Sequence, residues 1–150
     1  MIAAAAVEPR NDVERLFQEM METGSVELSL LPGDGFFWVH LGGTGGETLA
    51  CDCHADLWAA RTEHWSLYAK LGAARQVRFV RELDPHAPER DRLSIRFVGP
   101  SGASMLRGSF QPLYDEQGRP IAAQFARWEE LRAKYGGRDE LKVEGGLLVA

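Results

Sequence analysis

The apolar residues of this chain change their spacing twice, from a helical period to a period of two and back again. The first helical stripe predicts a helix over residues 11–23, which starts at the capping residue Asn11 and stops before Gly24. The second predicts a helix that begins near Pro120 and ends at Gly136. The apolar members of the two stripes are Val13, Leu16, Phe17, Met20, Met21, Ile121, Phe125, Trp128, Leu131 and Tyr135.

Between the two helices, short alternating segments separated by glycine and proline predict six or seven strands. The first two segments, near residues 25–30 and 36–41, are expected to form a hairpin, and so are 93–98 and 105–110. Further strands are expected at 47–53, at 65–71 and around Val77, residues 83–92 are expected to be a solvated loop, and 54–64 suits a short helix with extended flanks. Because few crossover helices separate the strands, we expect an α+β fold, a large mostly antiparallel sheet with N- and C-terminal helices packed on it.

Length and composition indicate one folded domain, 1–150, with a frayed start over 1–10 and a loose tail or an edge strand over 138–150. The net charge of -5 disfavours nucleic acid as a partner, and no apolar run reaches the ~20 residues that membrane insertion requires. The apolar residues 1–7 lack the basic flank of a secretory signal, and Cys51 and Cys53, with one residue between them on an extended segment, have poor geometry for a disulfide. A cytoplasmic location is therefore expected.

Several kinds of catalytic site are disfavoured by the motifs. The cluster Cys51, Cys53, His54 and His64 has the residue types of a zinc site, but structural zinc sites usually separate paired ligands by two or more residues. The glycine-rich segment 42–46 lacks the lysine and following helix of a phosphate-binding loop, and no nucleophile-elbow motif occurs. We therefore expect a binding protein rather than an enzyme.

Arginines interleave with apolar residues in the strand around Val77. The alternation predicts that Arg75 and Arg81 share a face with Val77 and Phe79, while Arg78 lies opposite. Such arginines can hold carboxylates at the rim of an apolar pocket, or can protect an edge strand from unwanted pairing. A similar choice, between pocket wall and core, applies to Trp38, Trp58 and Trp65.

Two stretches, 74–82 and 93–102, followed by a returning strand at 105–110 and a tryptophan-bearing helix at 125–131, resemble the haem-utilisation superfamily of HemS-type and ChuX/HutX-type proteins. The resemblance covers the second half of the chain by motif and the first half by element order. It implies haem, or another flat apolar ligand, as the partner and cofactor, with a role in haem transfer or haem-iron utilisation. The length is similar to one ChuX/HutX-type subunit, which implies a possible homodimer.

The resemblance also assigns residues. It implies His54 as the axial haem ligand with His64 as a substitute, and it places the family's second histidine at Lys70. Arg75 and Arg81 are the implied partners of the haem propionates, and the implied pocket wall consists of Trp58, Trp65 and Phe79. Two alternatives stay open: a non-enzymatic small-ligand or protein-interaction module that has lost haem ligation, and a metal-dependent enzyme built on the cysteines and histidines.

Overall fold

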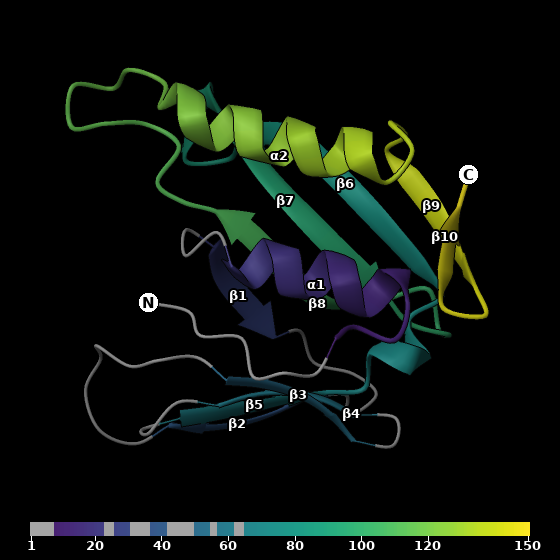
Figure 1. Cartoon of the computed structure of the whole chain (residues 1–150). Helices are drawn as coiled ribbons and strands as arrows, with labels where there is room; N and C mark the ends of the chain where they lie inside the picture. The colour runs from purple at the N-terminus through teal and green to yellow at the C-terminus, as the bar shows by residue number, and fades with distance from the viewer. Residues whose placement is uncertain (1–7, 23–25, 31–36, 42–49, 55–56, 62–64) are drawn as a thin grey trace.

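The structure is a computed structural model that describes residues 8–22, 26–30, 37–41, 50–54, 57–61 and 65–150 (Figure 1). The helices are α1 (Asp12–Glu22), the short 3-10 helix η1 (Leu71–Ala73) and α2 (Ala122–Lys134). The strands are β1 (Val26–Leu30), β2 (Phe37–Leu41), β3 (Ala50–His54), β4 (Leu57–Arg61), β5 (Trp65–Ala69), β6 (Gln76–Asp84), β7 (Ala87–Val98), β8 (Ser104–Phe110), β9 (Glu140–Glu144) and β10 (Leu147–Val149).

The strands form two antiparallel sheets. One has six strands in the order β1-β8-β7-β6-β9-β10, and the other has four in the order β2-β5-β4-β3. The expected α+β class is confirmed, as is the hairpin of β7 with β8. The hairpin expected between residues 25 and 41 is wrong, because β1 pairs with β8 whereas β2 pairs with β5. Alternation alone identifies a strand but does not choose its neighbour.

The region expected as the loop 83–92 is mostly strand. β6 continues to Asp84 and β7 begins at Ala87, so the turn consists of Pro85 and His86. The register shifts next to this turn, which makes room for Pro88 without breaking the ladder. Residues 57–61, where the pattern suited a helix, form β4.

The tail beyond residue 138 extends the edge of the six-stranded sheet. β9 pairs with β6, and β10 pairs with β9. Leu141 is fully buried, and Phe79 N donates to Asp139 O at 2.8 Å. The tail therefore forms the edge of the chain's own six-stranded sheet.

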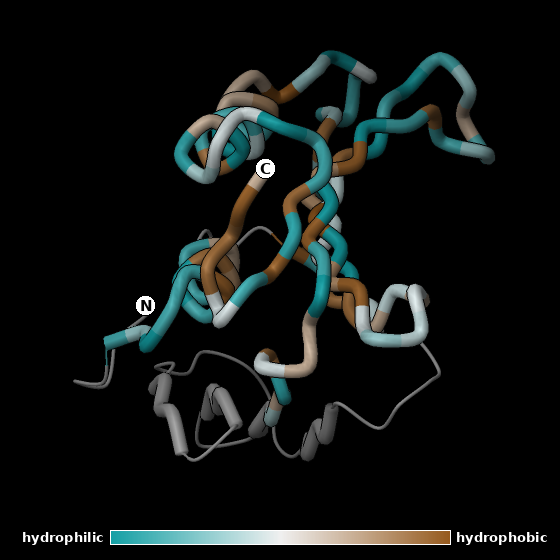
Figure 2. The backbone as a smooth tube through the Cα atoms, turned by 90° about the vertical axis from the view of Figure 1, so that its right-hand side faces the viewer, coloured by the Kyte–Doolittle hydropathy of each residue, from teal (hydrophilic) through white to brown (hydrophobic). Residues whose placement is uncertain are grey.

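Both long helices cover the same face of the six-stranded sheet (Figure 2). α1 begins as expected, since Glu14 N donates to Asn11 Oδ1 at 3.0 Å. Its apolar stripe is buried, and the Phe17 ring meets Phe97 of β7 edge-on with 5.5 Å between centroids. A fully buried side chain of this size contributes about 1.5–3 kcal/mol to the free energy of unfolding.

α2 is held on the sheet by Trp128. The indole Nε1 donates to the Ser94 carbonyl oxygen at 3.1 Å, and the ring packs edge-on against Phe79 at 6.0 Å. The helix begins at Ala122 rather than at Pro120, because Pro120 forms an isolated bridge with Tyr114. The predicted stripe holds at Trp128 and Leu131, which are both buried.

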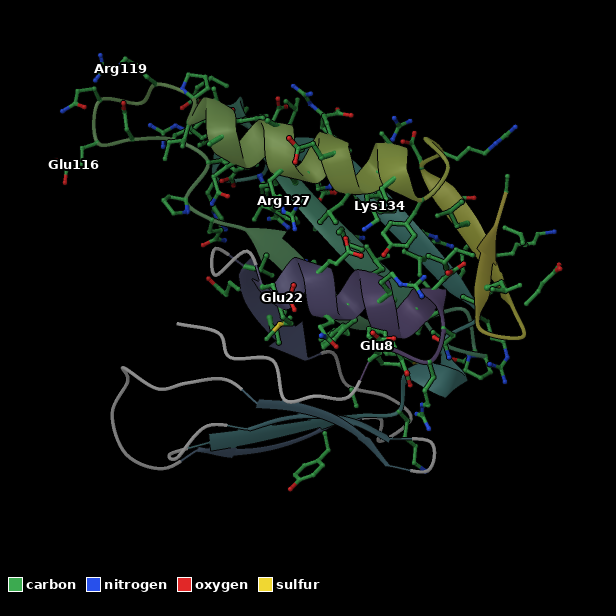
Figure 3. The ribbon with its side chains drawn as sticks, in the orientation of Figure 1. Glu8, Glu22, Glu116, Arg119, Arg127 and Lys134 are labelled. Atoms are coloured by element: carbon green, nitrogen blue, oxygen red, sulfur yellow. The ribbon has the colours of Figure 1, made fainter. Side chains whose placement is uncertain are left out.

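Glu19 of α1 joins the two helices. Its carboxylate accepts hydrogen bonds from the Tyr135 hydroxyl at 2.7 Å and from Lys134 Nζ at 2.8 Å. Its backbone oxygen accepts a bond from Arg127 at 3.4 Å; Figure 3 labels Arg127 and Lys134 on α2, the helix beside α1. Burial, and then the hydrogen bond to Glu19, raise the pKa of Tyr135 above its ordinary value. No helix in the described ranges is long and apolar enough to cross a membrane.

Candidate functional site: an arginine row on the sheet face away from the helices

The sheet face opposite the helices carries a row of arginines. Arg78 of β6 pairs in register with Arg96 of β7, and Arg96 pairs in register with Arg107 of β8. These side chains point away from the helices, because Val77 and Phe79, their neighbours by alternation, belong to the helix-covered core. Adjacent strands lie about 4.8 Å apart, so the three backbone positions fall within about 10 Å. We call these three residues the arginine row.

The ends of the arginine row are only weakly neutralised. Beyond Arg107 lies Ser29 of β1, whose Oγ is 3.5 Å from Arg107 Nη2. Beyond Arg78 lies Glu140 of β9, with 3.6 Å between Arg78 Nε and Oε1. The Glu140 side chain is 65% exposed, so solvent screens this ion pair strongly.

One carboxylate serves two guanidinium groups beside the row. Glu82 Oε1 accepts from Arg96 Nη2 at 2.9 Å and from Arg92 Nη2 at 3.3 Å. Like charges directly opposite each other on neighbouring strands destabilise a sheet. On this face, the three arginines Arg78, Arg92 and Arg96 share only two carboxylates, Glu82 and Glu140, so these ion pairs leave an excess of positive charge.

Two donors in the row lack acceptors. The Nε atoms of Arg96 and Arg107 are buried and have no hydrogen-bond partner within the described residues. A buried polar group left unsatisfied costs about 1–3 kcal/mol, and more when it is charged. A carboxylate or phosphate matches the fork that Nε and Nη present, and an anion would pair with these buried Nε atoms after the arginine side chains turn towards it.

The surface beside the row is built from short side chains. The next set of residues in register across the sheet is Val80, Ser94 and Ser109, followed by Glu27 of β1. These residues lie along one side of the arginine row, and Ser94 among them is only 4% exposed.

Three residues expected at the haem site have described side chains, and these lie away from the arginine row. Phe79, 2% exposed, is part of the core beneath Trp128. Arg81 shares its face, as alternation predicts, and is engaged by Asp91 at 2.7 Å and by the Phe125 ring. Arg75 Nη1 donates to the Gly72 oxygen at 2.9 Å. Because Arg75 and Arg81 are separated by about 20 Å of strand, the structure does not bring them together.

The backbone places the other expected residues on or near the four-stranded sheet. His54 ends β3 opposite Leu57, and Trp58 of β4 pairs with Cys53. Trp65 begins β5, and Lys70 follows β5 directly before η1. The side chains of His54, Trp58 and Trp65, and all of His64, lie outside the described structure, so their roles stay predictions. Among the described side chains, no cluster of three or more histidine, cysteine, aspartate or glutamate residues could hold a metal ion.

Arg96 and Arg107 were not singled out from the sequence. The signal was present, because two alternating segments joined by a glycine turn place Arg96 and Arg107 on one face. Finding their pairing requires the hairpin register, which shifts between Phe97 and Val98 and so cannot be counted from the turn alone.

No family model and no curated protein matches the chain. A solved structure of the protein AGR_C_4470 from Agrobacterium tumefaciens is similar with a TM-score of 0.57 and 20% identity, over 81% of this chain and 65% of that one. This chain therefore spans just under two thirds of that protein, and the likeness shows the fold alone. The haem-binding protein ChuX aligns with a TM-score of 0.47 and 15% identity over 85% of this chain and 93% of that one, which is too weak to support a conclusion.

Proposed function

We propose that this protein binds a flat ligand of the haem class and holds the ligand's carboxylates on the arginine row. The observation that carries the proposal is the pair of buried, unpartnered Nε atoms on Arg96 and Arg107. Haem-class macrocycles bring two carboxylates on one edge, which suits adjacent guanidinium groups on neighbouring strands. The partners previously expected for the carboxylates, Arg75 and Arg81, each have protein partners already.

Arginine suits this task better than lysine would. Its planar fork gives a carboxylate two parallel hydrogen bonds, and its charge does not titrate in the physiological range. The Arg96 side chain is 25% exposed, so its interactions are partly shielded from solvent and salt.

The iron of a haem would need a separate ligand. His86 has a described side chain, which is exposed at the turn between β6 and β7. The proposed axial ligand is therefore His54, with His64 as the substitute, as the family resemblance implies. When bound, haem supplies the iron chemistry, while the protein supplies ligation, polarity and access.

A second candidate function is a carrier for an iron-free anionic ligand. The family's second histidine position is Lys70 here, which favours a site that keeps the carboxylate contacts without full iron ligation. The two candidates share the arginine row and differ in whether binding depends on iron.

A titration with hemin and with iron-free protoporphyrin, followed by absorbance, tests both. Arg96→Gln and Arg107→Gln are each expected to weaken binding of both ligands by about tenfold, the equivalent of ~1.4 kcal/mol. His54→Ala is expected to change the hemin spectrum while leaving protoporphyrin affinity unchanged. The matched controls, Arg138→Gln and His86→Ala, change exposed residues outside the arginine row. Equal affinities for wild type and both row variants would overturn the proposal.

A further inference from the structure

A cavity of about 250 Å³ opens where β7 and β8 separate. The last paired residues are Ser94 and Ser109, after which the chain leaves the sheet edge and later returns as α2. The walls are the β7 segment 90–94, the segment 109–114 and Asp84. The cavity therefore lies at the end of the strands, next to the arginine row but centred on other residues.

The outer wall of the cavity is fixed by hydrogen bonds from the start of α2. Gln124 is 9% exposed, and its Nε2 donates to the Gln111 oxygen at 3.1 Å. Ile121 N donates to the Leu113 oxygen at 2.8 Å, and Tyr114 forms its bridge with Pro120. The cavity is thus preformed, which lowers the entropy cost of binding a ligand.

Hydroxyl groups face this cavity from both walls. The Tyr114 oxygen accepts a hydrogen bond from Asp91 N at 2.8 Å, so its own proton remains to be donated. Ser94 lines the β7 wall, and Ser109 lines the same wall as Tyr114. The proton of the Tyr114 hydroxyl favours a ligand that offers an acceptor oxygen.

A cation completes the site. The Arg90 guanidinium stacks over the Tyr114 ring at 5.0 Å and has no carboxylate within ion-pair distance in the described part of the chain. Of the two carboxylates in the walls, Asp91 pairs with Arg81 at 2.7 Å, and Asp84 Oδ1 accepts a hydrogen bond from the backbone His86 N at 2.9 Å. Arg92 also lines the cavity but pairs with Glu82 at 3.3 Å, so Arg90 is the lining cation without an ion pair among the described residues.

We infer that this cavity binds a small oxyanion, a phosphate monoester or a small carboxylate, through Arg90 and the hydroxyl of Tyr114. The cavity of about 250 Å³ has room for a ligand several times the size of a water molecule, which occupies about 30 Å³ in the liquid. Neither Arg96 nor Arg107 lines this cavity, although Ser94 and Ser109 border both the cavity and the arginine row. The test of this inference needs no hemin, so either proposal can fail without the other.

Amide NMR titrations of the full chain with inorganic phosphate and with citrate, against sodium chloride at equal ionic strength, test the inference. Shifts are expected at residues 90–94 and 109–114 with phosphate, with citrate or with both, and the responding anion identifies the ligand class. Arg90→Gln is expected to weaken binding by about tenfold. Tyr114→Phe keeps the ring beneath Arg90 and is expected to weaken binding less, while Arg138→Gln leaves it unchanged.

Two results would overturn the inference. One is the same shifts in chloride as in phosphate and citrate, or none in any of the three. The other is unchanged affinity in Arg90→Gln, with a wild-type spectrum elsewhere showing that the variant is folded.

Discussion

Arg96 and Arg107 face each other across the β7–β8 pair, and the Nε atoms of both are buried without a partner among the described residues. A sheet that needed only stability would place an opposite charge or a hydroxyl at one of these positions, because facing like charges cost free energy. Desolvation of the two donors adds to that cost. A ligand that binds the folded protein through these groups would offset both, which connects the row to function.

Trp128 is expected to be the most important single contact between α2 and the sheet. Trp128→Phe removes the hydrogen bond to the buried Ser94 oxygen and leaves space in the core, so the free energy of unfolding should fall by about 2 kcal/mol or more. Urea denaturation followed by circular dichroism measures the change. Phe125→Leu, a half-buried residue on the same helix, should cost less. A Trp128→Phe variant as stable as wild type would contradict this role.

Gly108 gives α1 its close approach to β8. A Cβ at this position would overlap Met20 Sδ and lie 2.8 Å from Met20 Cε. Gly108→Ala should therefore lower the free energy of unfolding by about 1–3 kcal/mol, towards the smaller figure because methionine adapts. In the double variant Gly108→Ala, Met20→Ala, the loss of stability should be smaller than the sum of the losses in the two single variants. Gly72→Ala, where nothing lies within 4 Å, is the control, and fully additive effects would refute the explanation.

The Tyr135 hydroxyl is expected to make stability fall at alkaline pH. Because the folded-state pKa of Tyr135 is raised above the ordinary value of 10.0, the folded protein holds this proton more tightly than the unfolded chain does. Its contribution is complete below about pH 10 and is lost as the pH rises towards the folded-state pKa. Tyr135→Phe should be less stable at pH 8 by about 1 kcal/mol. That difference should shrink at pH 11, and a constant difference across this range would disprove the linkage.

The sequence predicted which segments form helices and strands better than it predicted which strands pair with each other. The helical stripes of α1 and α2 were correct because a buried face at helical spacing leaves a pattern that local residues carry alone. The partner of β1 was wrong because it lies almost 80 residues away, in β8, and alternation contains no information about distant pairing. The strand at 87–92 was missed because Pro88 and its charged neighbours suggest a loop, whereas the bulge accommodates them.

The candidate site was predicted only in part. Alternation correctly put Arg78 on the opposite face from Phe79, but the importance of that face appears only when β6, β7 and β8 are brought into register. The sequence drew attention to Arg75 and Arg81, which the fold gives to other partners. The role of His54 stays a prediction, because only its backbone position in β3 is described.

The central claim is that the arginine row recognises carboxylates, and the most direct measurement compares protoporphyrin with its dimethyl ester, in which both carboxylates are blocked. Wild type should bind the free acid at least about tenfold more tightly than the ester, and this preference should largely vanish in an Arg96→Gln, Arg107→Gln double variant. Equal affinity of wild type for the acid and the ester, or an undiminished preference in the double variant, would contradict the account.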